Sequence, residues 1–249
     1  MSNADTFFFA DFTRANYRRL LTLMKDAYPI CTYDAFDPGE RFLLLRHDID
    51  FSMHAALKLA KIEQEEGVKA TYFVHFHNEF YNPFERSVSD KLREIVRLGH
   101  NVGLHFDSHY FDVDAEEQLV GLLEREKGYL EDIIKQAVRV FSFHRTSPFT
   151  LGCVQNAYAG MLNVYSTFFR DEVGYCSDSN GYWRHRRLED VLVAHTDARL
   201  QVLTHPAWWQ DNVMSPRERI EWCIAGRARS TRKIYEEVLL TSGRPEIDW

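Results

Sequence analysis

The segment "RFLLLRHDID", residues 41–50, decides the fold class of this chain. Its apolar run is short and continuous, which is typical of a strand that is buried on both faces in a parallel sheet. Arg46, His47, Asp48 and Asp50 come directly after the run. The segment therefore predicts a buried strand that ends at a group of ionisable side chains.

The same unit, a short apolar run followed by a longer helical pattern, recurs along the chain. Because runs and helical patterns alternate, we predict βα units that build a parallel sheet or barrel. The predicted strands are 41–45, 69–76, 101–104, 138–143, either 163–169 or 173–177, and 200–204. The predicted helices are 13–27, 53–66, 87–99, 114–136 and 215–240. We expect Ser52 to cap the second helix, Gly67 to follow its end, and Ser87 with Asp90 to form a capping box on the third.

Length and composition limit the class of protein. With 249 residues, 45% of them hydrophobic, the chain is long enough to bury one large core. We expect a single domain over 1–249, with an N-terminal helical extension at 1–40 and a C-terminal helix at 215–249. The net charge of −7, without a basic block, argues against nucleic acid as a partner, because phosphate binding needs clustered Lys and Arg.

The cysteines and the N-terminal residues indicate the cellular compartment. Cys31, Cys153, Cys176 and Cys223 form no CxxC pair, so a zinc finger is not expected. The first residues do not resemble a signal peptide, and no stretch approaches the length of a membrane span. We therefore expect a cytoplasmic protein with buried, reduced thiols, and the sequence does not indicate its oligomeric state.

Ionisable residues follow each of the later predicted strands, as they follow the first. In a parallel barrel the ends of all these strands lie on one rim, which is where such folds carry their chemistry. Chance is a poor explanation for this repetition at five strand ends. The convergence predicts an active site built from residues after 101–104, 138–143, 173–177 and 200–204, namely His105, Asp107, His109, His144, Arg145, Asp178 and His205.

The spacing of these residues along the chain suggests which of them bind a metal. Asp48 and Asp50 are two positions apart, so in an extended segment both carboxylates point the same way. His105 and His109 are four apart, and on one helical turn their rings would share a face. One carboxylate with two imidazoles makes a three-ligand metal site with open positions, the catalytic pattern. We predict Asp50, His105 and His109 as ligands, with His47 as the substitute for Asp50; the role of His144 stays open.

Six motifs in order carry a resemblance to a known family: "LLLRHDID", "GVKATYFV", "GHNVGLHFDSH", "FHRTSP", "DSNGYW" and "LTHP". Over roughly residues 42–209 the chain resembles the NodB-homology polysaccharide deacetylases, carbohydrate esterase family 4, as a divergent cytoplasmic branch. The resemblance implies a distorted (β/α) barrel and hydrolysis of an N-acetyl group on a sugar. It also implies a divalent metal, most often zinc, with nickel, cobalt, manganese and iron as alternatives.

The resemblance also implies catalytic roles at matching positions. Asp48 matches the catalytic base, and Arg145 matches the arginine that braces it. His205 matches the general acid, and Asp178 beside it would raise the pKa of its imidazole. Asp50, His105 and His109 match the metal ligands.

The resemblance also implies substrate contact at three further residues, Trp183, Pro148 and Leu203, although Asp178 and Trp183 stand further apart than the adjacent pair that is usual in the family. The chain departs from the family pattern at two other places. Phe106 stands where a small hydroxyl residue is usual, and Pro148 comes one position late. These departures concern the oxyanion-binding backbone near 147–149 and the substrate pocket more than the metal.

The sequence therefore predicts a metal-dependent hydrolase that removes an N-acyl group from an amino sugar, in surface-polysaccharide or glycoconjugate biosynthesis. One alternative is the same metal hydrolase acting on a non-sugar amide, such as a cyclic imide or ureide. A second is a catalytically inactive carbohydrate-binding relative. A third, an iron oxygenase with two histidines and one carboxylate, fits the alternating β and α pattern less well.

Overall fold

The computed structural model describes residues 2–245 and 247, and its central feature is one parallel sheet. Its strands are β1 (Ile30–Cys31), β2 (Phe42–Ile49), β3 (Thr71–Val74), β4 (Asn101–Phe106), β5 (Val140–Phe143), β6 (Ala157–Tyr158), β7 (Met161–Asn163), β8 (Gly174–Ser177) and β9 (Arg199–Thr204). The α-helices are α1 (Asn3–Thr6), α2 (Arg14–Ala27), α3 (Met53–Glu65), α4 (Arg86–Arg97), α5 (Glu116–Ile134), α6 (Pro148–Gly152), α7 (Thr167–Asp171), α8 (Leu188–Ala194) and α9 (Pro216–Thr241). Short 3₁₀ helices cover Phe9–Phe12, Ser179–Gly181 and Pro206–Trp208.

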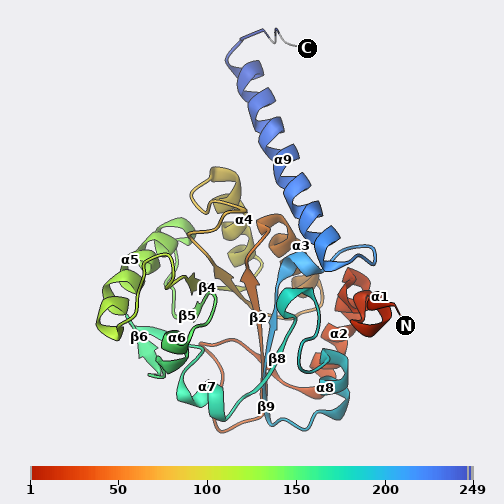
Figure 1. Cartoon of the computed structure of the whole chain (residues 1–249), viewed down its shortest axis with the longest axis vertical. Coiled ribbons are helices and arrows are strands. Elements are labelled where there is room, and N and C mark those ends of the chain that lie inside the picture. Colours follow the sequence, from red (N-terminus) through yellow and green to blue (C-terminus); the bar gives the residue numbers. More distant parts are fainter. Residues whose placement is uncertain (1, 246, 248–249) are drawn as a thin grey trace.

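The strand order is β6-β7-β5-β4-β3-β2-β9-β8, and β1 pairs with the start of β2. Every pair is parallel except β6 with β7. The sheet curls around its own axis, and β6 and β8 form its two edges, with α3, α4 and α5 outside it (Figure 1). The predicted α/β class, a distorted barrel in one domain, is confirmed. Of the two segments considered for the fifth strand, 173–177 is correct, because β8 covers Gly174–Ser177, whereas 163–169 is wrong, because β7 ends at Asn163 and α7 begins at Thr167.

Strand β2 is longer than its apolar run, since it continues through Arg46, His47 and Asp48 to Ile49. All eight of its residues are buried. Successive side chains of a strand point to opposite faces. The even-numbered side chains from Phe42 to Asp48 face the inside of the curved sheet, and the odd-numbered ones face the helices. One strand therefore holds Arg46 and Asp48 inside the barrel and His47 outside it.

Position 103 of β4 requires glycine because the ring of Phe73 on the neighbouring strand lies against it inside the barrel. A Cβ atom at this position would lie 2.7 Å from the ring of Phe73 on the neighbouring strand β3. Real Cβ atoms do not approach carbon this closely, so any side chain would displace the aromatic ring. The ring of Phe73 also lies 5.0 Å from the guanidinium carbon of Arg46, which links this packing to the charged end of β2.

The capping residues predicted for α3 are confirmed. Helix α4 is present, but the capping box predicted for it is wrong. The side chain of Ser52 accepts a hydrogen bond from the backbone N–H of Ala55, and Gly67 takes a positive φ of 70° just past α3. Helix α4 begins at Arg86, with Glu85 as its N-cap and no capping hydrogen bond from a side chain. Ser87 already lies inside this helix, so it cannot cap it.

Helix α9 leaves the body of the protein and ends near the C-terminus (Figure 1). Its start is a complete capping box between Ser215 and Glu218. Of the predicted C-terminal helical range 215–249, positions 246, 248 and 249 lie outside the described residues, as does position 1 of the N-terminal extension. Within residues 2–245 and 247, none of the helices combines the length and the apolar character needed to cross a membrane.

Candidate metal centre and catalytic rim

The ionisable residues that follow the parallel strands meet at one end of the sheet. Asp50 follows β2, His105 lies near the end of β4, and His144 follows β5 directly. On the other side, Asp178 follows β8 and His205 follows β9. Parallel strands end on the same rim, so the fold places these five side chains together although they are far apart in the sequence.

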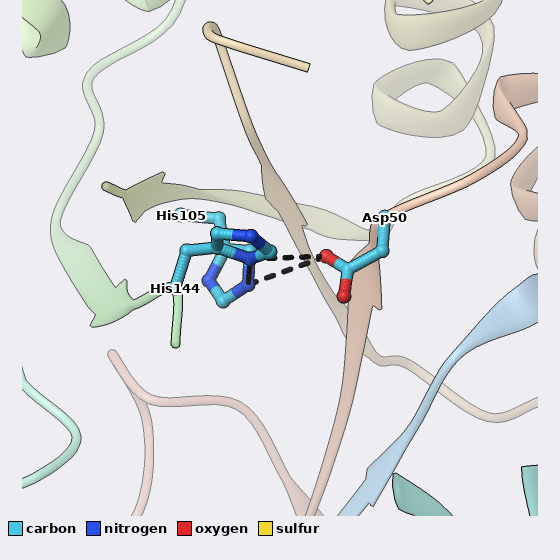
Figure 2. Close-up of side chains that lie close together, drawn as sticks. All are labelled: Asp50, His105 and His144. Atoms are coloured by element: carbon cyan, nitrogen blue, oxygen red, sulfur yellow. Dashed lines mark hydrogen bonds and ion pairs between the residues drawn. The ribbon is translucent and has the colours of Figure 1, made fainter. Parts of the chain in front are cut away.

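Asp50, His105 and His144 form the tightest group (Figure 2). The Oδ1 atom of Asp50 lies 3.4 Å from Nε2 of His105 and 3.6 Å from Nδ1 of His144. The two ring nitrogens are 3.2 Å apart. Burial alone would raise the pKa of Asp50, but the neighbouring imidazoles of His105 and His144 lower it well below its ordinary value. The group therefore presents a carboxylate and two imidazole nitrogens to one point.

These separations fit a metal ion. Ligand atoms about 2.0–2.1 Å from a tetrahedral zinc ion lie about 3.3 Å from one another. Oδ1 of Asp50 is buried and lacks a hydrogen-bond partner among the described residues, which is the state of an oxygen with an ion to bind. Nδ1 of His105 lies 2.7 Å from Oγ of Ser142 on the adjacent strand β5, and this contact fixes the ring with Nε2 toward the group. The donor set and its geometry therefore fit a divalent cation.

The structure does not bring His109 to this group. His105 lies on a strand and His109 in the turn after it, so the expected helical turn between them is wrong. The side chain of His109 is half exposed, and its Nδ1 lies 3.6 Å from Asp107. His144, whose role the sequence left open, occupies the third position instead. The four-residue spacing was misleading because it brings rings together only in a helix.

Asp48 receives its bracing from an arginine that we did not predict. Nε and one terminal nitrogen of Arg46 lie 3.2 and 2.7 Å from the two carboxylate oxygens of Asp48, and both side chains are buried. Burial would raise the pKa of Asp48, but Arg46 lowers it below its ordinary value. Arg145, predicted for this role, is exposed and has a left-handed φ of 51°. The missed signal is the spacing of Arg46 and Asp48, which share one face of a strand.

His205 and Asp178 form a hydrogen-bonded pair on the other side of Asp50. Nδ1 of His205 lies 2.7 Å from Oδ1 of Asp178, whose carboxylate also accepts the backbone N–H of His205. Burial would lower the pKa of His205, but the charge of Asp178 raises it to about 9. Its Nε2 faces Oδ2 of Asp50 at 3.6 Å. The imidazole therefore holds a proton at neutral pH and directs it toward the centre of the rim.

A second group lies beside the first and shares His144 with it. Nε2 of His75 is 3.4 Å from Oδ2 of Asp107, and the rings of His75 and His144 stack with centroids 4.2 Å apart. Asp50 and His144 of the first group and His75 and Asp107 of the second line a cavity of about 540 Å³, which we call the metal cavity, and Arg145 lines it too. The cavity gives the first group access to a ligand.

A buried polar network fixes β2 from the outside of the barrel. Nε2 of His47 lies 2.5 Å from Glu63 of α3, and its Nδ1 lies 2.6 Å from Oγ1 of Thr204. The Glu63 carboxylate also accepts hydrogen bonds from the hydroxyls of Tyr17 and Tyr72. All five side chains are buried, and the ring of His47 faces away from Asp48 and Asp50. His47, considered as a substitute ligand, is thus engaged elsewhere.

The three residues predicted to contact substrate lie in different surroundings. Trp183 packs against Phe12, with ring centroids 5.1 Å apart, and its Nε1–H donates to Asp11. Pro148 is exposed at the start of α6, and Leu203 is buried on β9. Among the described residues that line the metal cavity, these three do not occur. Their contact with a substrate stays a prediction.

No family model matches this chain. No curated protein matches it either. Solved structures resemble it at low identity. One is a pseudoenzyme of carbohydrate esterase family 4 from Bacillus anthracis, 16% identical, with 78% of this chain and 63% of that chain covered and a TM-score of 0.42. This chain thus spans less than two thirds of that protein's length.

Two further structures are covered over more than two thirds of their own length. A family 4 carbohydrate esterase from Bacillus anthracis is 15% identical, with 86% of each chain covered and a TM-score of 0.43. The chitin deacetylase of the fungal pathogen Colletotrichum lindemuthianum is 15% identical, with 74% of this chain and 81% of that chain covered and a TM-score of 0.41. Likeness at this level does not establish the chemistry of this chain, which depends on its own residues.

Proposed function

We propose that this protein is a metal-dependent hydrolase that removes an N-acyl group, such as acetyl, from an amino sugar. The observation that carries the proposal is the grouping of Asp50, His105 and His144 at ligand separations, with Asp48 and His205 next to the group. A base and an acid beside a cation site are the parts that amide hydrolysis needs. The amino sugar and the choice of zinc come from the motif resemblance.

Asp48 is the proposed general base. Its Oδ2 lies 3.6 Å from Nε2 of His105, so it borders the ligand group without belonging to it. Arg46 keeps the carboxylate ionised and holds it in one orientation through two hydrogen bonds. A bound divalent ion would polarise the acyl oxygen and acidify a water molecule. Asp48 then takes the proton from the attacking water.

His205 is the proposed general acid. The amine that leaves from a tetrahedral intermediate needs a proton, and a group with a pKa near 9 carries one at neutral pH. Asp178 orients the ring by its contact with Nδ1, so Nε2 is the atom that delivers the proton. The base lies 3.6 Å from His105 and the acid 3.6 Å from Asp50, so both border the ligand group.

The test combines a metal measurement with an activity measurement. Acetate release from acetamido sugars is measured after chelation and after return of Zn²⁺, Co²⁺ or Ni²⁺. Asp48→Asn should stay folded, retain bound metal and lose about 10²–10⁴ in rate, the usual contribution of a general base. Exposed Asp114 offers the matched control, Asp114→Asn, which should keep full activity. Bound metal without acetate release from any acylamino sugar would refute the sugar substrate.

A further inference from the structure

A second cavity, of about 280 Å³, lies between the start of α3, the segment that leads into α4, and the first turns of α9. We call it the cationic pocket because Arg14, Lys58, Arg227 and Arg229 line it. Among the described residues that line it, none is aspartate or glutamate. The chain as a whole carries a net charge of −7, so a pocket lined by basic and no acidic residues has the opposite sign to the net charge of the chain.

Two of the four cations are available for a ligand. Arg14 is paired with Asp211, and Arg227 donates to Glu85 at 2.7 Å. Lys58 and Arg229 make no ion pair within the part of the chain that the structure describes. An unpaired Lys and an unpaired Arg in one cavity favour an anion that accepts several hydrogen bonds.

His54 also lines the pocket, and the pKa of its side chain responds to the positive charges around it. Burial lowers its pKa, and the charges of Lys91, Lys58 and Arg227 lower it further. A like charge nearby disfavours the protonated ring, so Lys58 and Arg227 are close enough to repel a positive charge on His54. An anion bound there would relieve this repulsion.

The cationic pocket and the metal cavity share a wall. Phe51 and Phe80 line both cavities, and their rings pack edge to face with centroids 5.0 Å apart. Phe51 follows Asp50 directly in the chain. A ligand that reaches past this aromatic pair can therefore place one end at the metal cavity and the other among the cations.

We propose that the cationic pocket binds a phosphoryl group attached to the amino-sugar substrate, while the N-acyl group lies in the metal cavity. This inference rests on the proposed function and narrows its substrate to a phosphorylated sugar. A sugar phosphate and a nucleoside diphosphate sugar share this chemistry. Trp222, which lines the pocket with 54% of its surface exposed and Arg229 5.4 Å from its ring, offers a flat surface on which a nucleobase can stack.

The binding test uses inorganic pyrophosphate as the probe and isothermal titration calorimetry as the measurement. Lys58→Gln and Arg229→Gln should each weaken binding by about tenfold, as expected when a charged hydrogen-bonding partner is lost. Arg232→Gln is the matched control, since Arg232 lies further along α9 and does not line the pocket. Asp50→Asn should leave binding unchanged, which separates the pocket from coordination to a metal ion.

Three results would contradict the proposed anion site. They are a wild type that does not bind pyrophosphate, an Arg232→Gln variant that binds it as weakly as the pocket variants, and an Asp50→Asn variant that no longer binds it. The last would place the anion in the metal cavity. If pyrophosphate binds and the variants weaken binding as expected, the cationic pocket is an anion site. This holds even if no sugar is deacetylated, a result that would refute the proposed function alone.

The kinetic test compares three substrates: N-acetylglucosamine, its 1-phosphate, and the same sugar linked to uridine diphosphate. The phosphorylated sugars should have kcat/KM at least about tenfold above the neutral sugar, and Lys58→Gln should remove most of the difference. Trp222→Ala should affect only the nucleotide-linked substrate. Equal kcat/KM for neutral and phosphorylated sugars would overturn the pocket while leaving the deacetylase in place.

Discussion

The pair of Arg46 and Asp48 allows a prediction with a magnitude. Arg46→Met replaces a fully buried guanidinium with an apolar side chain of similar length and leaves the Asp48 carboxylate buried without its partner. Breaking a buried ion pair from one side costs about 3–5 kcal/mol, because the remaining charge has lost both water and counter-charge. For a chain of this size, that loss corresponds to a fall in melting temperature of roughly 6–20 °C.

The dependence on pH has a definite sign. In the wild type the pKa of Asp48 is lowered, so its contribution to stability is present above the pKa of the unfolded chain and is lost as the pH falls through the folded value. Without Arg46, burial is left to raise that pKa. The difference in melting temperature between the wild type and Arg46→Met should therefore be largest at neutral pH. It should begin to narrow above about pH 4, as Asp48 of the variant becomes protonated, and narrow further below it, as Asp48 of the wild type does.

The assay is thermal unfolding with a chelator present, for the wild type, Arg46→Met, Asp48→Asn and the double variant. The double variant has no buried charge without a partner. Its free energy of unfolding should therefore fall by at least about 1 kcal/mol less than the sum of the two single losses. Additive losses would mean that the two side chains do not stabilise each other. Arg46→Met should also lower the deacetylation rate and move the acidic limb of the pH profile to higher pH.

Three other predictions follow from the geometry. His144→Ala should lose bound metal and His109→Ala should keep it, as measured by mass spectrometry of the purified proteins; the reverse pattern would restore His109 as the ligand. Burial raises the pKa of Glu126 to about 8, so its ionisation opposes folding as the pH rises from about 4.5 to 8. Glu126→Gln should therefore stabilise the protein by about 1–3 kcal/mol at pH 9 and not at pH 4, seen by chemical denaturation, and an equal effect at both pH values would contradict this. Glu63→Ala should cost about 3–5 kcal/mol because it leaves His47 and two tyrosine hydroxyls unpaired, whereas exposed Glu65→Ala should cost under about 1 kcal/mol; comparable losses in both would show that the network contributes little.

The strands and the rim were predictable because each depends on local pattern. Continuous apolar runs identified the parallel strands, and the residues after them marked the rim without any knowledge of strand order. Asp50 and His105 came from this reasoning and lie 3.4 Å apart in the structure. The position of an ionisable residue relative to a strand end thus carried most of the information about the site.

The third ligand position was not predictable from spacing. His109 was favoured because four residues separate it from His105, yet the chain after Phe106 turns and carries it outward. His144 follows a different strand, and only the pairing of β4 with β5 brings its ring to His105. Sequence separation of this kind reveals nothing about contact until the strand order is known.

Arg46 was missed for a different reason. Its spacing from Asp48 was visible in the sequence, but the motif resemblance pointed to Arg145 for the same role. The structure places the guanidinium of Arg46 on the carboxylate and leaves Arg145 exposed. In this chain Asp48 and its counter-ion come from one strand, so two residues of a single segment set the protonation state of this carboxylate.

Strand β2 is held on both of its faces by charged or polar groups, Arg46 with Asp48 inside and His47 with Glu63 outside. The rim end of this strand therefore has little freedom to slide or rotate. Backbone amide protons of residues 46–49 should consequently exchange with deuterium among the slowest in the protein. A substitution at Glu63, which is buried on the outside of the barrel, should then loosen the orientation of Asp48 and Asp50, so that helix α3 controls the geometry of the rim from outside the barrel.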